Sequence, residues 1–325
     1  MVRRQLTAAV FSRVSEFMLT QARDIERHRF QWEFLNHSPH NYVESLAKYQ
    51  NADGGFAYGI ESDFHLPLST PMATSVGLRY LHAVPNTLKP EIVAIKHLMI
   101  ENALHWLIPS FDIDRRGWPA VRSEVNDYPH APWWNWDPAT KQTVIDNSWG
   151  NPSAELMGYY IQYRELLPEK QYQDFIDATT DYALRQLEGK TEFHSEHEIY
   201  CYLRLFKALS QNQQNRIRPR LTAAIRQLMV VDPAQWGKYV PMPLHFLQHP
   251  SDNQFEISKD ILDKNLDYQL DRLESDALIS PSWDWGEDGE YGSFWDTAKV
   301  HWTGVLTLRA LQVLRNFGYL NLSDF

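Results

Sequence analysis

A pair of adjacent glycines between two helical patterns is the feature that most constrains how this chain folds. Gly54 and Gly55 lie near the end of the segment 46–56, and glycine adopts backbone angles that other residues avoid, so the chain turns sharply there. Apolar residues at helical spacing precede the turn. After it, Thr70 and Pro71 provide a helix N-cap and a proline at the first helical position. The sequence therefore predicts a unit of helix, glycine turn and helix.

This unit resembles a known repeat. Gln50, Gly54 and Phe56 match the pattern Gln-x-x-x-Gly-x-aromatic, which is similar to the repeat of terpenoid cyclases and of the β subunits of protein prenyltransferases. The segment 295–306 opens with Trp-Asp-Thr-Ala and resembles an inner helix of the class II terpenoid cyclases, which include squalene cyclases. The resemblance implies an α/α toroid, in which inner and outer helices alternate along the chain.

The catalytic motifs of these families are matched only in part. In class II cyclases the middle aspartate of Asp-x-Asp-Asp protonates the substrate, whereas residues 293–296 are Ser-Phe-Trp-Asp, so Asp296 alone remains. Prenyltransferases bind zinc through an aspartate, a cysteine two residues later and a histidine. Asp296 and His301 match two of these ligands, but residue 298 is Ala298. The resemblance therefore implies a fold more directly than a reaction.

Composition narrows the class of protein. The chain has 325 residues, of which 43% are hydrophobic, as in ordinary globular proteins. A net charge of −10 argues against a nucleic-acid partner. The single cysteine, Cys201, excludes an internal disulfide. No signal peptide and no apolar run of membrane-spanning length is visible, so we expect a cytoplasmic protein without a membrane span.

The apolar periodicity predicts an all-α protein of about eleven helices in a single domain from residue 1 to residue 325. Two long loops, 108–151 and 280–295, hold or border eight of the twelve tryptophans. Loops of this length inside a compact domain are usually functional. If the fold is a toroid, the helices that follow the loops rich in glycine, tryptophan and acidic residues are the inner ones. These helices are predicted at 70–81, 152–163, 196–209 and 297–314.

Carboxylates near these helix starts are the candidate catalytic residues, namely Glu61, Asp63 and Asp296. Glu61, Asp63 and His65 are spaced by two, so an extended backbone would point all three to one side. Close carboxylates favour a proton donor beside a base. A structural alternative is that the acids cap helix termini, and a hard-metal site is a third reading of the same spacing.

In a toroid, the N-termini of the inner helices would share one mouth. The candidate substrate-binding residues are predicted to lie around this mouth: Trp283, Trp285, Trp302, His301, His197 and Asn151. The tryptophans could line an apolar cavity or, alternatively, pack the ends of the toroid. His194, His197 and Cys201 share one helical face that could bind zinc. A polar first turn followed by a buried cysteine explains them without a metal, so we expect no metal and no cofactor.

These residues predict an enzyme that acts on a hydrophobic, isoprenoid-like small molecule by carboxylate acid/base chemistry. One alternative is a carbohydrate hydrolase or lyase, because acids lie beside Trp283 and Trp285: Asp284, Glu287, Asp288 and Glu290. The other is a non-catalytic binding or scaffold protein that has lost the cyclase motif. The sequence leaves the substrate and the oligomeric state open.

The glycine-turn carboxylates provide a first test. We expect Glu61→Gln and Asp63→Asn to remove activity or ligand binding and to leave the fold intact. The measurement is thermal unfolding of both variants beside a ligand assay. If the acids are caps, stability falls instead by about 1–3 kcal/mol while binding is retained.

Overall fold

The computed structural model describes residues 4–286 and 290–321. Within these ranges it contains twelve α-helices, short 3₁₀ helices and no β-structure beyond four isolated bridges. The all-α prediction is thus confirmed. The chain divides into two compact units: unit 1 comprises Met1–Tyr42 and Leu228–Phe325, and unit 2 comprises Val43–Gln227.

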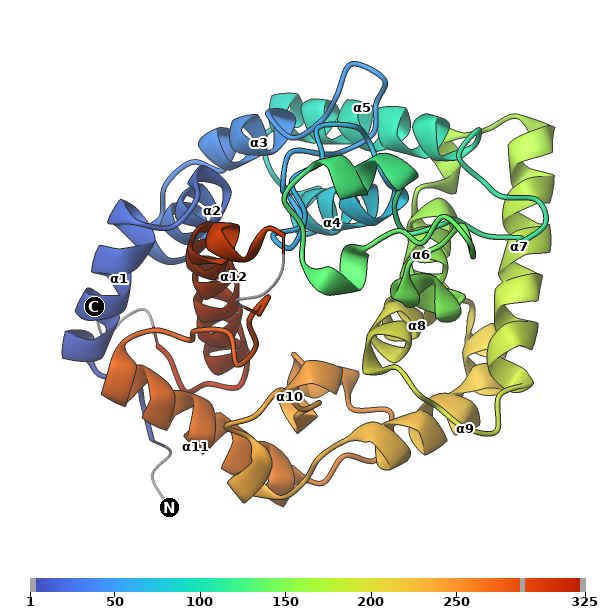
Figure 1. Ribbon diagram of the computed structural model, residues 1–325. Helices are drawn as coiled ribbons and strands as arrows, with labels where there is room; N and C mark the ends of the chain where they lie inside the picture. The colour runs from blue at the N-terminus through green and yellow to red at the C-terminus, as the bar shows by residue number, and fades with distance from the viewer. Residues whose placement is uncertain (1–3, 287–289, 322–325) are drawn as a thin grey trace. The chain divides into compact units, whose positions relative to one another are not determined.

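Unit 2 is built from two layers of helices. The bounds are α3 (His40–Ala47, which begins in unit 1), α4 (Pro71–His82), α5 (Pro90–Leu107), α6 (Gly150–Gln162), α7 (Lys170–Glu188), α8 (Glu196–Ala208) and α9 (Gln211–Leu228). Figure 1 shows α4, α6 and α8 in one layer and α5, α7 and α9 in a second layer beside it. Helix α6 packs against α4, α7 and α8. The helices predicted at 70–81, 152–163 and 196–209 therefore form one layer of this unit.

Burial explains the layering. Eleven consecutive residues of α6, from Gly150 to Tyr160, are buried, and a helix that is buried on all sides must lie in the middle of its unit. By contrast, α7 buries residues along one stripe only, and its other residues are exposed or half-buried. The absence of a side chain at Gly158 lets α6 approach α8 closely, because a Cβ there would lie 3.2 Å from the Cα of Leu205.

The glycine turn fastens the α3–α4 connection to α5. The side-chain amide of Gln50 donates to the carbonyl of Gly54 and to the carbonyl of Met99 in α5, both at 2.8 Å. Phe56 is fully buried and packs on Gly77 of α4, where a Cβ would lie 2.5 Å from its ring. The three residues of the repeat-like pattern thus have a structural role, because they hold the turn against α4 and α5.

The start of α4 follows the predicted chemistry. Thr70 is the N-cap residue, and its hydroxyl accepts from the backbone N–H of Ala73 at 3.1 Å. Pro71 occupies the first turn, where its missing N–H costs nothing.

Unit 1 contains α1 (Ala8–Thr20), α2 (Asp24–Leu35), α10 (Pro243–Phe246), α11 (Lys259–Asp276) and α12 (Trp295–Asn316). Helix α12 packs against α2 and α11, and α1 against α2 and α11. Glu33 of α2 joins α12, since it accepts from Arg315 at 2.7 Å and from Gln312 at 2.8 Å. Arg29 donates to the same carboxylate at 2.7 Å.

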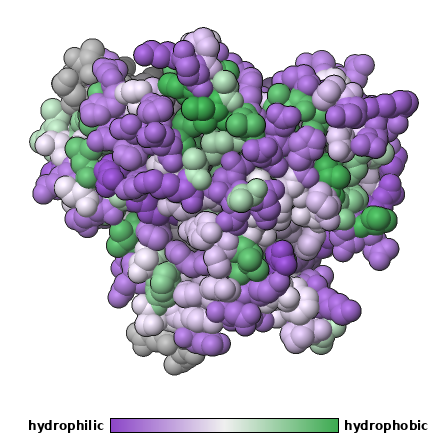
Figure 2. Space-filling model, turned by 90° about the horizontal axis from the view of Figure 1, so that it is seen from above, coloured by the Kyte–Doolittle hydropathy of each residue, from purple (hydrophilic) through white to green (hydrophobic). Residues whose placement is uncertain are grey.

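The face of the molecule drawn in Figure 2 is mostly hydrophilic, with hydrophobic residues in small separate groups. Among the described residues, no helix combines the length and the apolar character that crossing a bilayer requires.

Gly54→Ala tests the glycine turn. Gly54 has φ +98°, and a Cβ would lie 2.5 Å from the backbone carbonyl oxygen of Asn102, so alanine is strained both by its backbone angles and by contact. We expect a loss of about 1–3 kcal/mol in the free energy of unfolding, measured by urea denaturation. Gly237→Ala is the control, because a Cβ there meets nothing within 4 Å. Equal stability of the two variants would contradict this account of the turn.

Candidate functional site

A buried carboxylate shared by two arginines is the most unusual polar feature of unit 2. Glu155 of α6 accepts from Arg79 of α4 in bidentate fashion, with Nε–Oε1 at 2.8 Å and Nη2–Oε2 at 2.7 Å. Arg204 of α8 forms a second ion pair, with its Nε 3.3 Å from Oε1. The hydroxyl of Tyr159 donates to Oε1 at 2.9 Å. We call Arg79, Glu155, Tyr159 and Arg204 the arginine–glutamate cluster.

Helical spacing brings these groups together. Residues three or four apart lie on the same face of a helix. Each of the three helices has polar residues at this spacing. They are Arg79 and His82 on α4, Glu155 and Tyr159 on α6 with Tyr163 just beyond its end, and Cys201 and Arg204 on α8. The cluster thus lies where three helices of one layer meet.

The carboxylate is charged although it is buried. Glu155 is 1% exposed, and burial alone would raise its pKa. Arg204 and Arg79, together with hydrogen bonds from Arg79 and Tyr159, instead lower the pKa of Glu155 to about 2. Burial and the neighbouring carboxylate raise the pKa of Tyr159, so its hydroxyl keeps its proton and remains a donor.

The cluster has more positive charge and more donors than Glu155 can satisfy. Two guanidinium groups face one carboxylate, and their side chains remain 31% and 30% exposed. Within the described part of the chain, Arg204 donates no hydrogen bond to a protein acceptor, and Nη1 of Arg79 makes none either. Guanidinium groups with accessible donors are suited to carboxylate or phosphate oxygens.

Cys201 and Asn151 border this cluster. The Sγ atom of Cys201 lies 3.8 Å from Oε2 of Glu155 and 3.6 Å from Oδ1 of Asn151. Burial and Glu155 raise the pKa of the Cys201 thiol, so at neutral pH it is not the thiolate that nucleophilic attack or metal binding needs. Asn151, a predicted substrate-binding residue, therefore lies beside the cluster at the start of α6.

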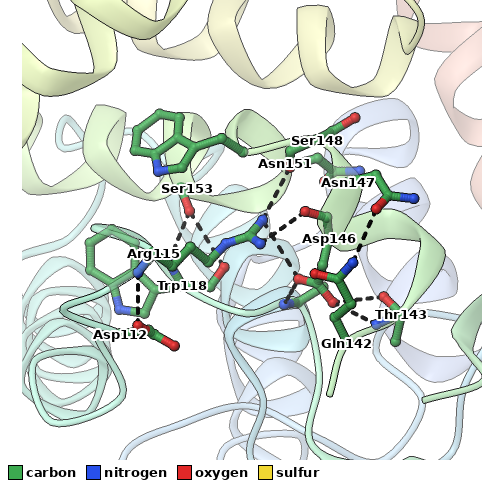
Figure 3. A network of polar contacts seen from close by, with 12 residues as sticks. Asp112, Arg115, Trp118, Gln142, Thr143, Asp146, Asn147, Ser148, Asn151 and Ser153 are labelled. Atoms are coloured by element: carbon green, nitrogen blue, oxygen red, sulfur yellow. Dashed lines mark hydrogen bonds and ion pairs between the residues drawn. The ribbon is translucent and has the colours of Figure 1, made fainter. Parts of the chain in front are cut away.

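The long loop 108–151 is held by a second polar network, shown in Figure 3. The carboxylate of Asp146 accepts from the backbone N–H of Ala120 at 2.8 Å and from the N–H and hydroxyl of Thr143 at 3.0 and 2.8 Å. Arg115 points toward this residue and donates to its carbonyl at 2.8 Å. Trp118 is fully buried and stacks on Tyr160, with centroids 5.6 Å apart. These contacts indicate a structural role for this network and for Trp118.

The predicted pair Glu61 and Asp63 lies in a turn. The backbone N–H of Phe64 donates to the carbonyl of Glu61 at 3.4 Å, and the carboxylate of Glu61 accepts from the N–H of Asp63 at 3.3 Å. The expectation of an extended segment that points both acids to one side is therefore wrong, because a local hydrogen bond bends the backbone. Asp63 is buried, and its carbonyl accepts from the N–H of Ala131 in the long loop.

His197 lies in the first turn of α8. Its side chain is 50% exposed, and its Nε2 is 3.8 Å from Glu196. His194 precedes the helix and is 81% exposed, whereas Cys201 is buried. Across residues 4–286 and 290–321, no group of three or more His, Cys, Asp or Glu side chains is arranged to hold a metal ion.

The other predicted site residues belong to unit 1. Trp283 and Trp302 contact each other edge to face, with centroids 5.2 Å apart, and Tyr239 packs on Trp283 at 5.3 Å. Trp285 is buried and stacks on Phe294. The structure thus brings two of the three predicted tryptophans together.

Asp296 is exposed in the first turn of α12, and His301 is half-buried one turn further along the same helix. The acids proposed for a carbohydrate site are exposed at Asp284 and Glu290. Glu287 and Asp288 lie outside the described residues.

Comparisons with protein-family models, with curated proteins and with solved structures find no match for this chain.

The arginine–glutamate cluster was not predicted from the sequence, although the sequence contains a signal for it. Residues 70–81 and 152–163 are almost entirely apolar or small, and each contains one charged residue, Arg79 and Glu155. A single charge in such a helix must be buried with a partner, because an unpaired buried charge is costly. Each such single charge therefore signals a buried ion pair, and its partner can be named once the adjacent helices are known.

Glu155→Gln tests the cluster by pH. The pKa of Glu155 is about 2 in the folded protein, against 4.5 for an ordinary glutamate. A pKa that is lower in the folded state stabilises the fold at every pH above the unfolded-state pKa. This stabilisation is lost as the pH falls from about 4.5 toward about 2. We expect the wild type to lose about 3 kcal/mol across this window, and the variant to lack that loss. At neutral pH the variant should be less stable by about 3–5 kcal/mol, because both arginines lose their partner.

The readout is urea unfolding of both proteins at neutral and acidic pH. Glu124→Gln is a matched control, since Glu124 pairs with Arg122 at 2.8 Å on the surface, where an ion pair contributes little. An unchanged acid response in Glu155→Gln would show that the carboxylate is not charged in the folded protein.

Proposed function

We propose that this protein binds a small molecule through an anionic group, which Arg79 and Arg204 hold on the face shared by α4, α6 and α8. The remainder of the ligand is proposed to be apolar and isoprenoid-like. The protein is proposed to act on it as an enzyme of the terpenoid cyclase-like class. In this proposal the arginines anchor the anionic group of the substrate, and the carboxylates Glu61, Asp63 and Asp296 remain the candidates for acid/base chemistry that the sequence suggested.

The observation that carries the proposal is the surplus of donors at Arg204. A purely structural ion pair needs only enough donors to satisfy the buried carboxylate, because the carboxylate is the group that would be costly to leave without partners. Arg79 supplies two such donors along one edge of its guanidinium. Arg204 contacts the same carboxylate through Nε alone and keeps its terminal nitrogens accessible. An incoming anion can use these donors without displacing Glu155.

Charge supports the same assignment. The chain has a net charge of −10, yet positive groups are concentrated here: Lys96 and Lys207 are close enough to act on His82, one turn from Arg79. A local positive field in an acidic protein raises the concentration of small anions at that place.

The apolar part of the ligand rests on the resemblance of the glycine-turn unit to the cyclase and prenyltransferase repeat. The alternation of α4, α6 and α8 with α5, α7 and α9 is compatible with the α/α toroid that this resemblance implies, and the toroid is part of the proposal. A non-catalytic binding protein would use the same arginines, and turnover of the bound ligand distinguishes it from an enzyme.

Calorimetric titration with a graded series of ligands tests the proposal: pyrophosphate, geranyl diphosphate and geraniol separate the anionic and apolar contributions. We expect geranyl diphosphate to bind most tightly and geraniol most weakly. Arg204→Gln should weaken binding of the anions about 10- to 100-fold, the equivalent of one or two charge-assisted hydrogen bonds. The variant should melt at a lower temperature but still fold, because Arg79 and Tyr159 remain partners of Glu155.

Arg220→Gln is the control, since Arg220 is an exposed arginine on α9 of the same unit. Equal affinities of wild type and Arg204→Gln for pyrophosphate would refute the role of the arginines. Binding of geraniol as tight as that of geranyl diphosphate would refute the need for an anionic group.

A further inference from the structure

His82 occupies a defined position beside the arginine–glutamate cluster. It lies in the last turn of α4, three residues after Arg79 and therefore on the same helical face. Its Nδ1 is 2.9 Å from the hydroxyl of Tyr163, and its ring packs near those of Tyr159 and Tyr163, with both centroid distances 6.0 Å. The residue as a whole reaches solvent, whereas the contact of its Nδ1 with Tyr163 is partly buried. Within the described chain its Nε2 has no protein partner.

Tyr163 can serve both protonation states of this histidine. Burial raises the pKa of Tyr163, so the phenol remains a hydroxyl, which can donate as well as accept. It donates to Nδ1 when the imidazole is neutral and accepts from Nδ1–H when the imidazole is charged. The ring can therefore gain or lose a proton at neutral pH without losing its anchor.

The charges around His82 come from three helices. Burial of the ring within its surroundings, followed by Lys96 of α5 and Lys207 of α8, lowers the pKa of His82, while Glu155 of α6 raises it. Lys96 is 2% exposed and donates to the carbonyl of Val84 at 2.5 Å and to Oδ1 of Asn86 at 2.8 Å. Neither acceptor carries a charge, so the positive charge of Lys96 is not neutralised by its partners.

The aromatic neighbours add no charge at neutral pH. Tyr159 and Tyr163 stay protonated, as argued above. In the free protein His82 is thus a neutral imidazole in a field that is positive on balance. The group that would balance this field is an anion bound by the arginines.

We propose that His82 takes up a proton when the arginine–glutamate cluster binds a doubly charged anion, so that the ligand class of this site is a phosphate- or sulfate-like dianion. This inference rests on the proposed function and specifies its anionic group. A monoanion would leave the cluster closer to neutral with His82 uncharged. The two arginines and Glu155 together carry one net positive charge, which neutralises one charge of a dianion. The second negative charge of the dianion is neutralised by the imidazolium of His82.

The linkage has a definite sign. Binding raises the pKa of His82, so the extra affinity is fully present below the pKa of the free protein and is lost as pH rises through that of the complex. A rise of about one unit corresponds to about tenfold tighter binding at low pH. Sulfate is the suitable probe, because it keeps both charges throughout the range in which histidine titrates.

The experiment is an NMR titration of the histidine Cε1–H signals against pH, with and without sodium sulfate, and with sodium chloride at equal ionic strength. We expect sulfate to raise the pKa of His82 by about one unit, and its affinity to be about tenfold higher near pH 5 than near pH 8. His82→Gln should bind sulfate at pH 8 as the wild type does, with a flat pH profile.

His105→Gln is the matched control, since His105 lies in the last turn of α5 beside a tyrosine, Tyr172, with ring centroids 5.6 Å apart. Its signal should not respond to sulfate, and its substitution should leave the profile unchanged. Sulfate binding that Arg204→Gln weakens, with the pKa of His82 unmoved, would overturn this inference and leave the proposed function standing. No binding of sulfate at the arginines, or an equal response of His105, would overturn both.

Discussion

The ion pair of a fully buried carboxylate with two arginines determines how three helices of unit 2 can be arranged. Glu155 is charged, and a charge removed from water costs several kcal/mol unless partners replace the lost hydration. Arg79 and Arg204 come from the helices on either side of α6, so the cost is offset only when α4, α6 and α8 have the correct rotation and register. The apolar contacts between these helices define a layer, and the ion pair selects one arrangement of it.

The sequence predicted those parts of the fold that local chemistry controls. The N-cap at Thr70, the glycine turn and the helix periods depend on neighbouring residues, and all three are present. The extended conformation expected around Glu61 and Asp63 failed for the same kind of reason, since a local hydrogen bond from Phe64 to Glu61 makes a turn. Alternation of side chains is a valid argument only where a ladder of hydrogen bonds keeps a segment extended, and nothing in the sequence required such a ladder there.

The candidate site was harder to predict because its members are far apart along the chain. Arg79, Glu155 and Arg204 are separated by 76 and 49 residues, and no short motif links them. Catalytic residues are often found in loops, so the loop acids Glu61 and Asp63 were the natural candidates. The more informative pattern was a single charged residue in a helix that is otherwise apolar. The pairing of two such residues requires knowledge of which helices are adjacent.

The same reasoning explains why the cluster is better suited to a ligand than to stability alone. Well-packed apolar residues in place of a buried ion pair often leave a protein equally or more stable, so stability alone does not require Glu155 and its partners. A structural pair also needs one arginine, and here a second one adds a charge whose terminal donors stay accessible. Tyr159 donates a further hydrogen bond to Oε1 of the carboxylate without adding charge. What remains after Glu155 is satisfied are the accessible donors of Arg204 in a cluster that also has, three residues after Arg79, a histidine that can change its charge. Charged donors of this kind are suited to recognition of an anion.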